Sequence, residues 1–140
     1  MASFVKYQCF VENLAEKVHN LGSDTLKIML SNTAPNVSTH TVRASATELS
    51  TGGGYTSGGA TVTVTGSSQS GGTYSLTQSA DVVFTATTGF GPFQYAILYN
   101  DTPTSPADPL IGYWDYGSPI TLTAAETFTV DMGATILTIA

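Results

Sequence analysis

Charged side chains are scarce in this sequence. Lys and Arg number four and Asp and Glu ten, so that charged residues make up 10% of the chain, against about 25% in ordinary soluble proteins. Nucleic-acid binding needs clustered Lys and Arg to displace counterions from phosphates, and a net charge of -6 argues against such a partner. Uncharged Thr, Ser, Gly and Asn must cover the surface instead, a composition typical of β-rich proteins.

Cysteine and histidine are almost absent. Cys9 is the single cysteine, so no disulfide can form within the chain. His19 and His40 are the only histidines, and neither belongs to a motif that would supply a nucleophile, a base and an orienting acid. The one cysteine and the two histidines are also not spaced like the ligands of a structural zinc site. We therefore predict a protein that is not an enzyme and binds no cofactor or metal ion.

Long apolar stretches are missing as well. Lys6, Glu12 and Glu16 interrupt any apolar core of a signal peptide, and no stretch approaches the ~18 apolar residues of a membrane span. We expect a chain that is made and folded in a cytoplasm and has no membrane partner.

The residues present suffice for a single domain, 1–140, because domains most often run ~100–150 residues. Apolar residues recur with a helical period at the N-terminal end. The stripe consists of Phe4, Tyr7, Phe10, Val11, Leu14, Ala15, Val18 and Leu21. Ser3 is a suitable N-cap and Gly22 a suitable left-handed C-terminal residue. The pattern predicts one amphipathic helix over about 4–21.

From residue 24 the period changes to two, which indicates strands. Short apolar or alternating runs cover 25–32, 60–65, 73–77, 81–86, 93–100, 110–116, 120–122, 127–130 and 134–139, with a further short strand expected within 39–46. The Gly-rich segment 52–59 and the Pro-rich segment 102–109 are predicted loops. We predict a mainly β fold, an antiparallel, jelly-roll-like β-sandwich of about seven or eight strands over 24–140. The most apolar runs, 93–100 and 110–116, belong in the sheet centre or against a partner subunit.

Two groups of side chains suggest ligand binding, but a plainer interpretation is favoured for each. Asp101, Asp108 and Asp115 lie in or near the Pro-rich segment, yet they lack the spacing of a calcium loop, and turn capping is the usual role of such residues. Trp114 and Tyr116 are candidate glycan contacts on one face of their strand. Core packing is the favoured use of these aromatic rings.

Several segments spread through the chain resemble a family of small tailed-phage and prophage proteins. They are Asn13-Leu-Ala-Glu-Lys-Val-His-Asn-Leu-Gly-Ser-Asp-Thr-Leu-Lys27, Leu30-Ser-Asn-Thr-Ala-Pro35, Gly54-Tyr-Thr-Ser-Gly-Gly-Ala60, Asp81-Val-Val-Phe84, Gly91-Pro-Phe-Gln-Tyr95, Leu98-Tyr-Asn-Asp101 and Leu110-Ile-Gly-Tyr-Trp-Asp-Tyr-Gly117. The resemblance implies a virion or prophage origin, and no catalytic residue carries over from it.

By analogy of size and composition, the leading prediction is a capsid decoration, or cement, protein. Its partners would be the major capsid protein and copies of itself, and its place the capsid surface of a virion assembled in a bacterial host. Alternatives are a glycan- or receptor-binding module of a head or tail fibre, and a head-to-tail or tail ring component. Candidate contacts lie in three elements, the N-terminal helix, the Gly-rich segment and the Pro-rich loop. They are Val5, Cys9, Tyr55, Pro103 and Pro106.

Cys9 has two interpretations, because it falls outside the apolar stripe together with Val5. It is either a half-exposed, inert thiol or part of a helix flank that another subunit buries.

Overall fold

The computed structural model describes residues 2–140 and is mainly β, with 50% of the chain in strands and 8% helical. The strands are β1 (Phe4–Lys6), β2 (Leu26–Ser31), β3 (Ala60–Thr61), β4 (Val64–Ser70), β5 (Thr73–Gln78), β6 (Val82–Thr85), β7 (Gly89–Asn100), β8 (Leu110–Thr123), β9 (Thr127–Val130) and β10 (Thr135–Ile139). The helices are α1 (Gln8–Ala15) and a short 3-10 turn, η1 (Arg43–Ser45). All strand pairs are antiparallel. The prediction of a mainly β, antiparallel chain with one α-helix is confirmed.

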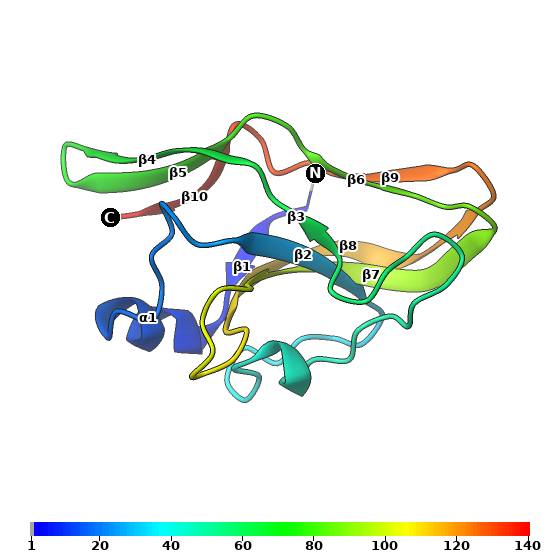
Figure 1. Ribbon diagram of the computed structural model, residues 1–140, viewed down its shortest axis with the longest axis horizontal. Helices are drawn as coiled ribbons and strands as arrows, with labels where there is room; N and C mark the ends of the chain where they lie inside the picture. Colours follow the sequence, from blue (N-terminus) through cyan, green and yellow to red (C-terminus); the bar gives the residue numbers. More distant parts are fainter. Residues whose placement is uncertain (1) are drawn as a thin grey trace.

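The strands form three sheets. A five-stranded sheet has the order β1-β8-β7-β2-β3, a second the order β10-β5-β4, and the third is the pair β6-β9. The two smaller sheets lie on one side of the large sheet, and α1, η1 and the long loops lie on the other (Figure 1). Both faces of the large sheet are therefore covered.

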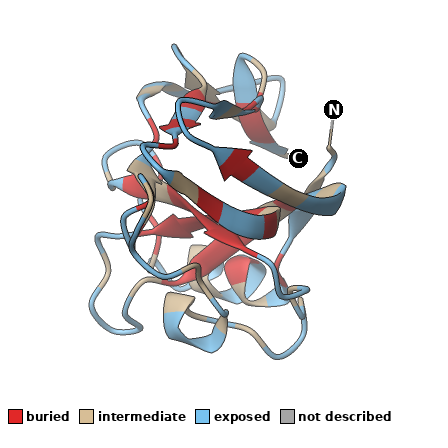
Figure 2. Cartoon of the chain, turned by 90° about the vertical axis from the view of Figure 1, so that its right-hand side faces the viewer, coloured by how far each residue is buried: buried red, intermediate tan, exposed pale blue. Residues whose placement is uncertain are grey.

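The central strands are apolar on both sides, as a sheet covered on both faces requires. On β7, Ala96 and Leu98 belong to the main core cluster between the sheets, whereas Ile97 and Tyr99 belong to a second cluster beneath the loops. All four are fully buried, and the buried residues concentrate along these strands (Figure 2). The predicted central position of the runs 93–100 and 110–116 is confirmed.

Phe93 departs from the predicted alternation along β7. Strict alternation would place Phe93 on the face of Ile97, but it packs in the main cluster with Ala96. The register between β7 and β8 shifts between Phe93 and Tyr95, and such a bulge turns the following side chains to the opposite face.

The N-terminal helix is shorter than the predicted span 4–21. Residues 4–6 form β1 instead, which pairs with β8 through Phe4 opposite Trp114. The Tyr7 N–H donates to the Ile111 carbonyl at 3.1 Å. Pairing with β8 gives the backbone N–H and C=O groups hydrogen-bond partners, as a helical turn would. Over so few residues, the spacing of apolar side chains cannot distinguish a strand from a helix.

The helix ends well before Gly22, the predicted terminator. Lys17 adopts a left-handed backbone with φ of 67°. The Val18 N–H donates to the Asn13 carbonyl at 2.9 Å, and the Lys17 N–H to the Leu14 carbonyl at 3.4 Å. These are the two hydrogen bonds of a Schellman motif, in which a lysine occupies the position usually taken by glycine.

The Gly-rich segment 52–59 is a loop, as predicted, and it packs closely against the rest of the chain. The Gly53 carbonyl accepts from the N–H groups of Thr87, Thr88 and Gly89. At Gly59, a Cβ atom would lie 1.8 Å from the Ile28 carbonyl oxygen of β2. Glycine is needed here because the backbone itself makes the contact, with φ of 77°.

Two further local predictions were wrong. Residues 39–46 contain η1 and a single bridge from Val42 to Pro109 in place of a strand. The predicted run 60–65 is divided between β3 and β4, and β4 extends to Ser70, so that only Gly71 and Gly72 make the turn to β5. The runs 110–116 and 120–122 also merge into the one strand β8.

Within residues 2–140, no helix has both the length and the apolar character needed to cross a membrane.

Candidate docking groove

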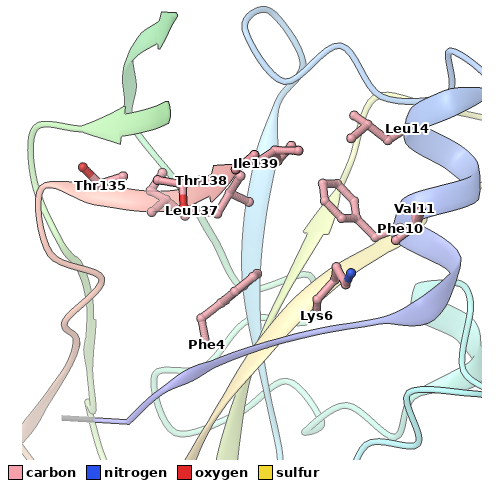
Figure 3. A pocket seen from close by; sticks show the side chains of 11 residues that line it. Phe4, Lys6, Phe10, Val11, Leu14, Thr135, Leu137, Thr138 and Ile139 are labelled. Atoms are coloured by element: carbon pink, nitrogen blue, oxygen red, sulfur yellow. The ribbon is translucent and has the colours of Figure 1, made fainter. Parts of the chain in front are cut away.

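A groove of about 740 Å³ separates the N-terminal elements from the last strand. Phe4 and Lys6 of β1 and Phe10, Val11 and Leu14 of α1 form one wall. The other wall is β10 with the residues that follow it, 135–140. The close-up in Figure 3 shows Phe4, Phe10 and Leu14 directed toward the space in front of β10. The groove is therefore mainly apolar and open to solvent.

Both strands beside the groove are edge strands, since β1 begins the five-stranded order and β10 begins the three-stranded one. The Tyr7 N–H points to β8, and hydrogen-bonding direction alternates along an antiparallel strand. The backbone groups of Phe4 and Lys6 consequently point away from β8. A free edge of this kind is a template for pairing with another extended chain.

The charge of the groove differs from that of the whole chain. None of its lining residues is acidic, and the one charged side chain among them is Lys6. Lys6 makes no ion pair among residues 2–140. On a chain of net charge -6, this surface favours an apolar segment with a carboxylate opposite Lys6.

The β10 edge also lacks the usual protection against pairing. Its sequence, Thr135-Ile-Leu-Thr-Ile139, contains no charged residue or proline, and β-branched residues dominate it. Natural proteins commonly place lysine or proline on such edges. A bulge between Thr135 and Leu137 is the one protective feature of this strand.

The structure brings two of the predicted interface residues together at a different place. Cys9 and Pro106 line a smaller cavity of about 370 Å³ between α1 and the loops. Val5 is 38% exposed and Pro103 is half-buried, and neither lines this cavity. Of the five predicted contacts, Val5 and Pro106 are therefore the exposed ones.

The Cys9 thiol is half-buried by this chain's own residues. Its Sγ lies 3.5 Å from the Thr41 carbonyl oxygen and 3.7 Å from that of Leu110. Burial raises the pKa of the Cys9 thiol above its usual value. No second subunit is needed to explain the position of this side chain off the main apolar stripe.

Cys9 is accordingly expected to react slowly. A buried thiol with a raised pKa holds little thiolate, so we expect Ellman's reagent at pH 7.5 to modify the native protein at least ~10-fold more slowly than the urea-unfolded protein. Since Cys9 is the single cysteine, the released chromophore reports on it alone. Equal rates in the two states would show that the thiol is not protected.

Tyr55 is not available as an interface residue, and that prediction was wrong. Its side chain is 1% exposed, and its ring packs 5.8 Å from Phe84 and 5.7 Å from Phe90. Its hydroxyl donates to Glu48 at 2.7 Å and accepts from the Leu30 N–H at 3.1 Å. The aromatic ring thus anchors the Gly-rich segment in the core.

Glu48 is the centre of a polar cluster that the sequence did not reveal. Its carboxylate accepts from Arg43 at 2.8 and 3.1 Å, from Tyr55, from Ser57 and from the Gly58 N–H. The Glu48 side chain is 11% exposed. The only sequence signal was a pair of opposite charges five residues apart, which no regular element places together. This cluster is structural, since every carboxylate oxygen is occupied by the chain itself.

Trp114 does not form an exposed sugar-binding surface. The ring is 3% exposed and lies 5.1 Å from Phe4, so its predicted role as a glycan contact is wrong. Tyr116 is half-buried 4.9 Å from Phe128, and burial raises its pKa to about 12. A glycan contact at Tyr116 stays a prediction.

The three aspartates considered for calcium have other partners. Asp101 pairs with Lys27 at 3.5 Å and Asp108 with Arg43 at 3.9 Å. Asp115 accepts from the Gly117 N–H at 2.8 Å. Across residues 2–140, no group of three or more His, Cys, Asp or Glu side chains could hold a metal ion.

Fold and groove together define a mainly β, antiparallel chain with two strand edges beside one mainly apolar groove, in which Lys6 is the one charged side chain. No protein-family model, curated protein or solved structure matches this chain. The resemblance to tailed-phage proteins therefore stays a prediction.

Proposed function

We propose that this chain is a structural protein of a tailed-phage particle, a capsid decoration protein that binds the major capsid protein and copies of itself on the virion surface. The observation that carries the proposal is the groove between β1, α1 and β10. Its occupant would be an extended segment of a capsid subunit. Many identical copies on a lattice would make even a weak contact effective through multivalency.

The chemistry of the groove supports an extended occupant. The strand edges offer backbone donors and acceptors, which pair with any extended chain whatever its side chains. Phe4, Val11 and Leu14 offer apolar area for alternate side chains, which supplies affinity. Lys6 favours a segment with an acidic residue at one position.

We further infer that the sheets form a jelly-roll-like β-sandwich. In support, the main core cluster takes residues from all three sheets, such as Leu30, Leu76 and Val130. A sandwich would give a rigid body suited to stiffening a shell, with Thr and Ser facing solvent.

Binding to capsids that lack this chain tests the proposal. Val11 lies on the groove and is 53% exposed, whereas Val83 of β6 is 51% exposed and does not line the groove. We expect saturable co-sedimentation of the unchanged protein, and at least ~10-fold weaker binding of Val11→Asp, since desolvating an unpaired carboxylate in an apolar contact costs at least ~1.4 kcal/mol.

Val83→Asp is the matched control and should bind as the unchanged chain does. Melting temperatures of both variants establish that each is folded. Failure of the unchanged protein to bind saturably would count against decoration, and equal loss with both variants would count against the groove. Cryo-electron microscopy of the particle would then show whether the chain lies over the capsid lattice or at a tail or vertex, as the fibre and ring alternatives require.

A further inference from the structure

Asn100 is a buried junction at the end of β7. Its side-chain Nδ2 lies 3.0 Å from Nδ1 of His19 and 2.7 Å from Oδ2 of Asp24. Its Oδ1 accepts from the Thr102 N–H at 3.1 Å. Asn100 is fully buried, so both amide hydrogens and the amide oxygen are committed to these three partners.

This arrangement selects one tautomer of His19. Because Asn100 donates one hydrogen to the Asp24 carboxylate and the other to the imidazole, Nδ1 must be the acceptor and Nε2 must carry the proton. Nε2 is buried and has no hydrogen-bond partner among residues 2–140. The His19 ring is 6% exposed, and water therefore does not stabilise a charged form.

The surroundings of His19 are mostly apolar. Phe10 of α1 lies 5.2 Å from the imidazole, and Leu14 and Ile139 border the same surface pocket. The titratable groups around the ring are Asp24 and Lys17 of the α1–β2 connection and Tyr74 of β5. Burial lowers the pKa of His19 below 6.5, and the nearby Asp24 carboxylate offsets this only in part.

Asn100 joins two connections that are far apart in the sequence. His19 and Asp24 belong to the segment between α1 and β2, and Thr102 opens the loop between β7 and β8. The same two segments also meet through Thr25, whose N–H donates to Thr102 Oγ1 and whose carbonyl accepts from the Asp101 N–H, each at 2.8 Å. The Asn100 side chain is thus one of the contacts that hold both segments at the end of β7.

We propose that His19 and Asn100 form an acid-sensitive contact, which helps to hold segments 16–25 and 101–109 to β7 while His19 is neutral and which loosens one of them when Nδ1 takes up a proton. A protonated Nδ1 cannot accept from Asn100, so the bond to His19 breaks. If the Asn100 amide rotates to present Oδ1 to the new N–H, the Thr102 N–H loses its acceptor. Either response removes one hydrogen bond of this cluster, at His19 or at Thr102, and leaves the segments held by the bonds of Asp24 and Thr25.

The direction of the pH effect follows from linkage. The folded-state pKa of His19 is lower than the unfolded value of 6.5, so below about pH 6.5 the unfolded chain binds a proton that the native chain does not. The contribution to stability is therefore complete above pH 6.5 and is lost as the pH falls toward the folded-state pKa.

Amide hydrogen exchange at pH 7.5 and pH 5, corrected for the intrinsic rates, measures this loosening directly. We expect exchange in segments 16–25 and 101–109 to rise at least ~10-fold relative to β8 at the lower pH. His19→Asn places an amide oxygen near the position of Nδ1 and should abolish this rise. His40→Asn is the control and should leave it unchanged, because His40 lies outside the junction and accepts from the Asn36 N–H at 3.2 Å.

Nuclear magnetic resonance of the unchanged protein keeps the test independent of any variant. The imidazole nitrogen shifts of His19 should indicate the Nε2–H tautomer at pH 7.5 and a titration midpoint below 6.5. The opposite tautomer, a midpoint at or above 6.5, or an acid response that persists in His19→Asn would overturn the proposal.

Discussion

Replacing Gly59 by alanine is expected to lower the free energy of unfolding by about 3 kcal/mol or more. The new Cβ would lie 1.8 Å from the Ile28 carbonyl oxygen and 2.9 Å from the Met29 Cα. Both atoms belong to β2, which is paired on its other side with β7 and cannot move without disturbing the central sheet. Urea unfolding followed by tryptophan fluorescence measures the change, since Trp114 is the single tryptophan and is buried in the core.

Gly71→Ala is the matched control for this prediction. Gly71 has a left-handed backbone as well, with φ of 59°, but a Cβ there would have no atom within 4 Å. Replacing Gly71 should lower the free energy of unfolding by about 1 kcal/mol, the cost of placing a Cβ atom on a left-handed backbone. If the two variants were destabilised equally, the close approach of Gly59 to β2 would contribute nothing to the difference.

Replacing Glu48 by alanine is expected to lower the free energy of unfolding by about 3 kcal/mol. The change removes the acceptor of the buried Tyr55 hydroxyl and the nearer of the two carboxylates that pair with Arg43. The Gly58 N–H loses its acceptor too. Because these groups anchor residues 43–58 to the sheet, the unfolding midpoint in urea should fall accordingly.

Two further variants separate the contributions. Glu48→Gln keeps an oxygen for the Tyr55 hydroxyl but removes the charge opposite Arg43, so we expect about half of the loss. Glu16→Ala removes an exposed carboxylate at the end of α1 and should change stability by less than about 0.5 kcal/mol. A loss for Glu48→Ala no larger than that for Glu16→Ala would contradict the assigned role.

The parts of the fold that were predictable have strong local signals. The runs around Leu98 and Ile111 are continuously apolar, and their burial on both faces followed from that pattern. The start of the chain was not predictable, because Phe4, Tyr7 and Phe10 fit a helical stripe although Phe4 pairs with Trp114 in a sheet. Tertiary pairing decided between two local structures that the sequence left nearly equal.

The groove and the polar clusters could not be predicted from the sequence, for a different reason. Phe10 and Leu137 border one groove, and His19 and Asn100 share one hydrogen bond, but each pair is widely separated along the chain. The close packing of the Gly-rich loop was not predictable, because glycines that permit flexibility and glycines that permit close backbone contact look alike in a sequence. Only the approach of Gly59 to Ile28 distinguishes the two.

The pairing order of the large sheet has a consequence for synthesis on the ribosome. The first two strands of this sheet pair with strands that are synthesised much later, since Leu26 of β2 pairs with Asn100 and Phe4 of β1 pairs with Trp114. Until translation passes Asn100, β2 can pair only with the two residues of β3, and β1 has no partner until Trp114 has been made. We therefore expect the large sheet to form only after translation passes Trp114, with the apolar side chains of β2 open to chaperones and to aggregation before β7 is made.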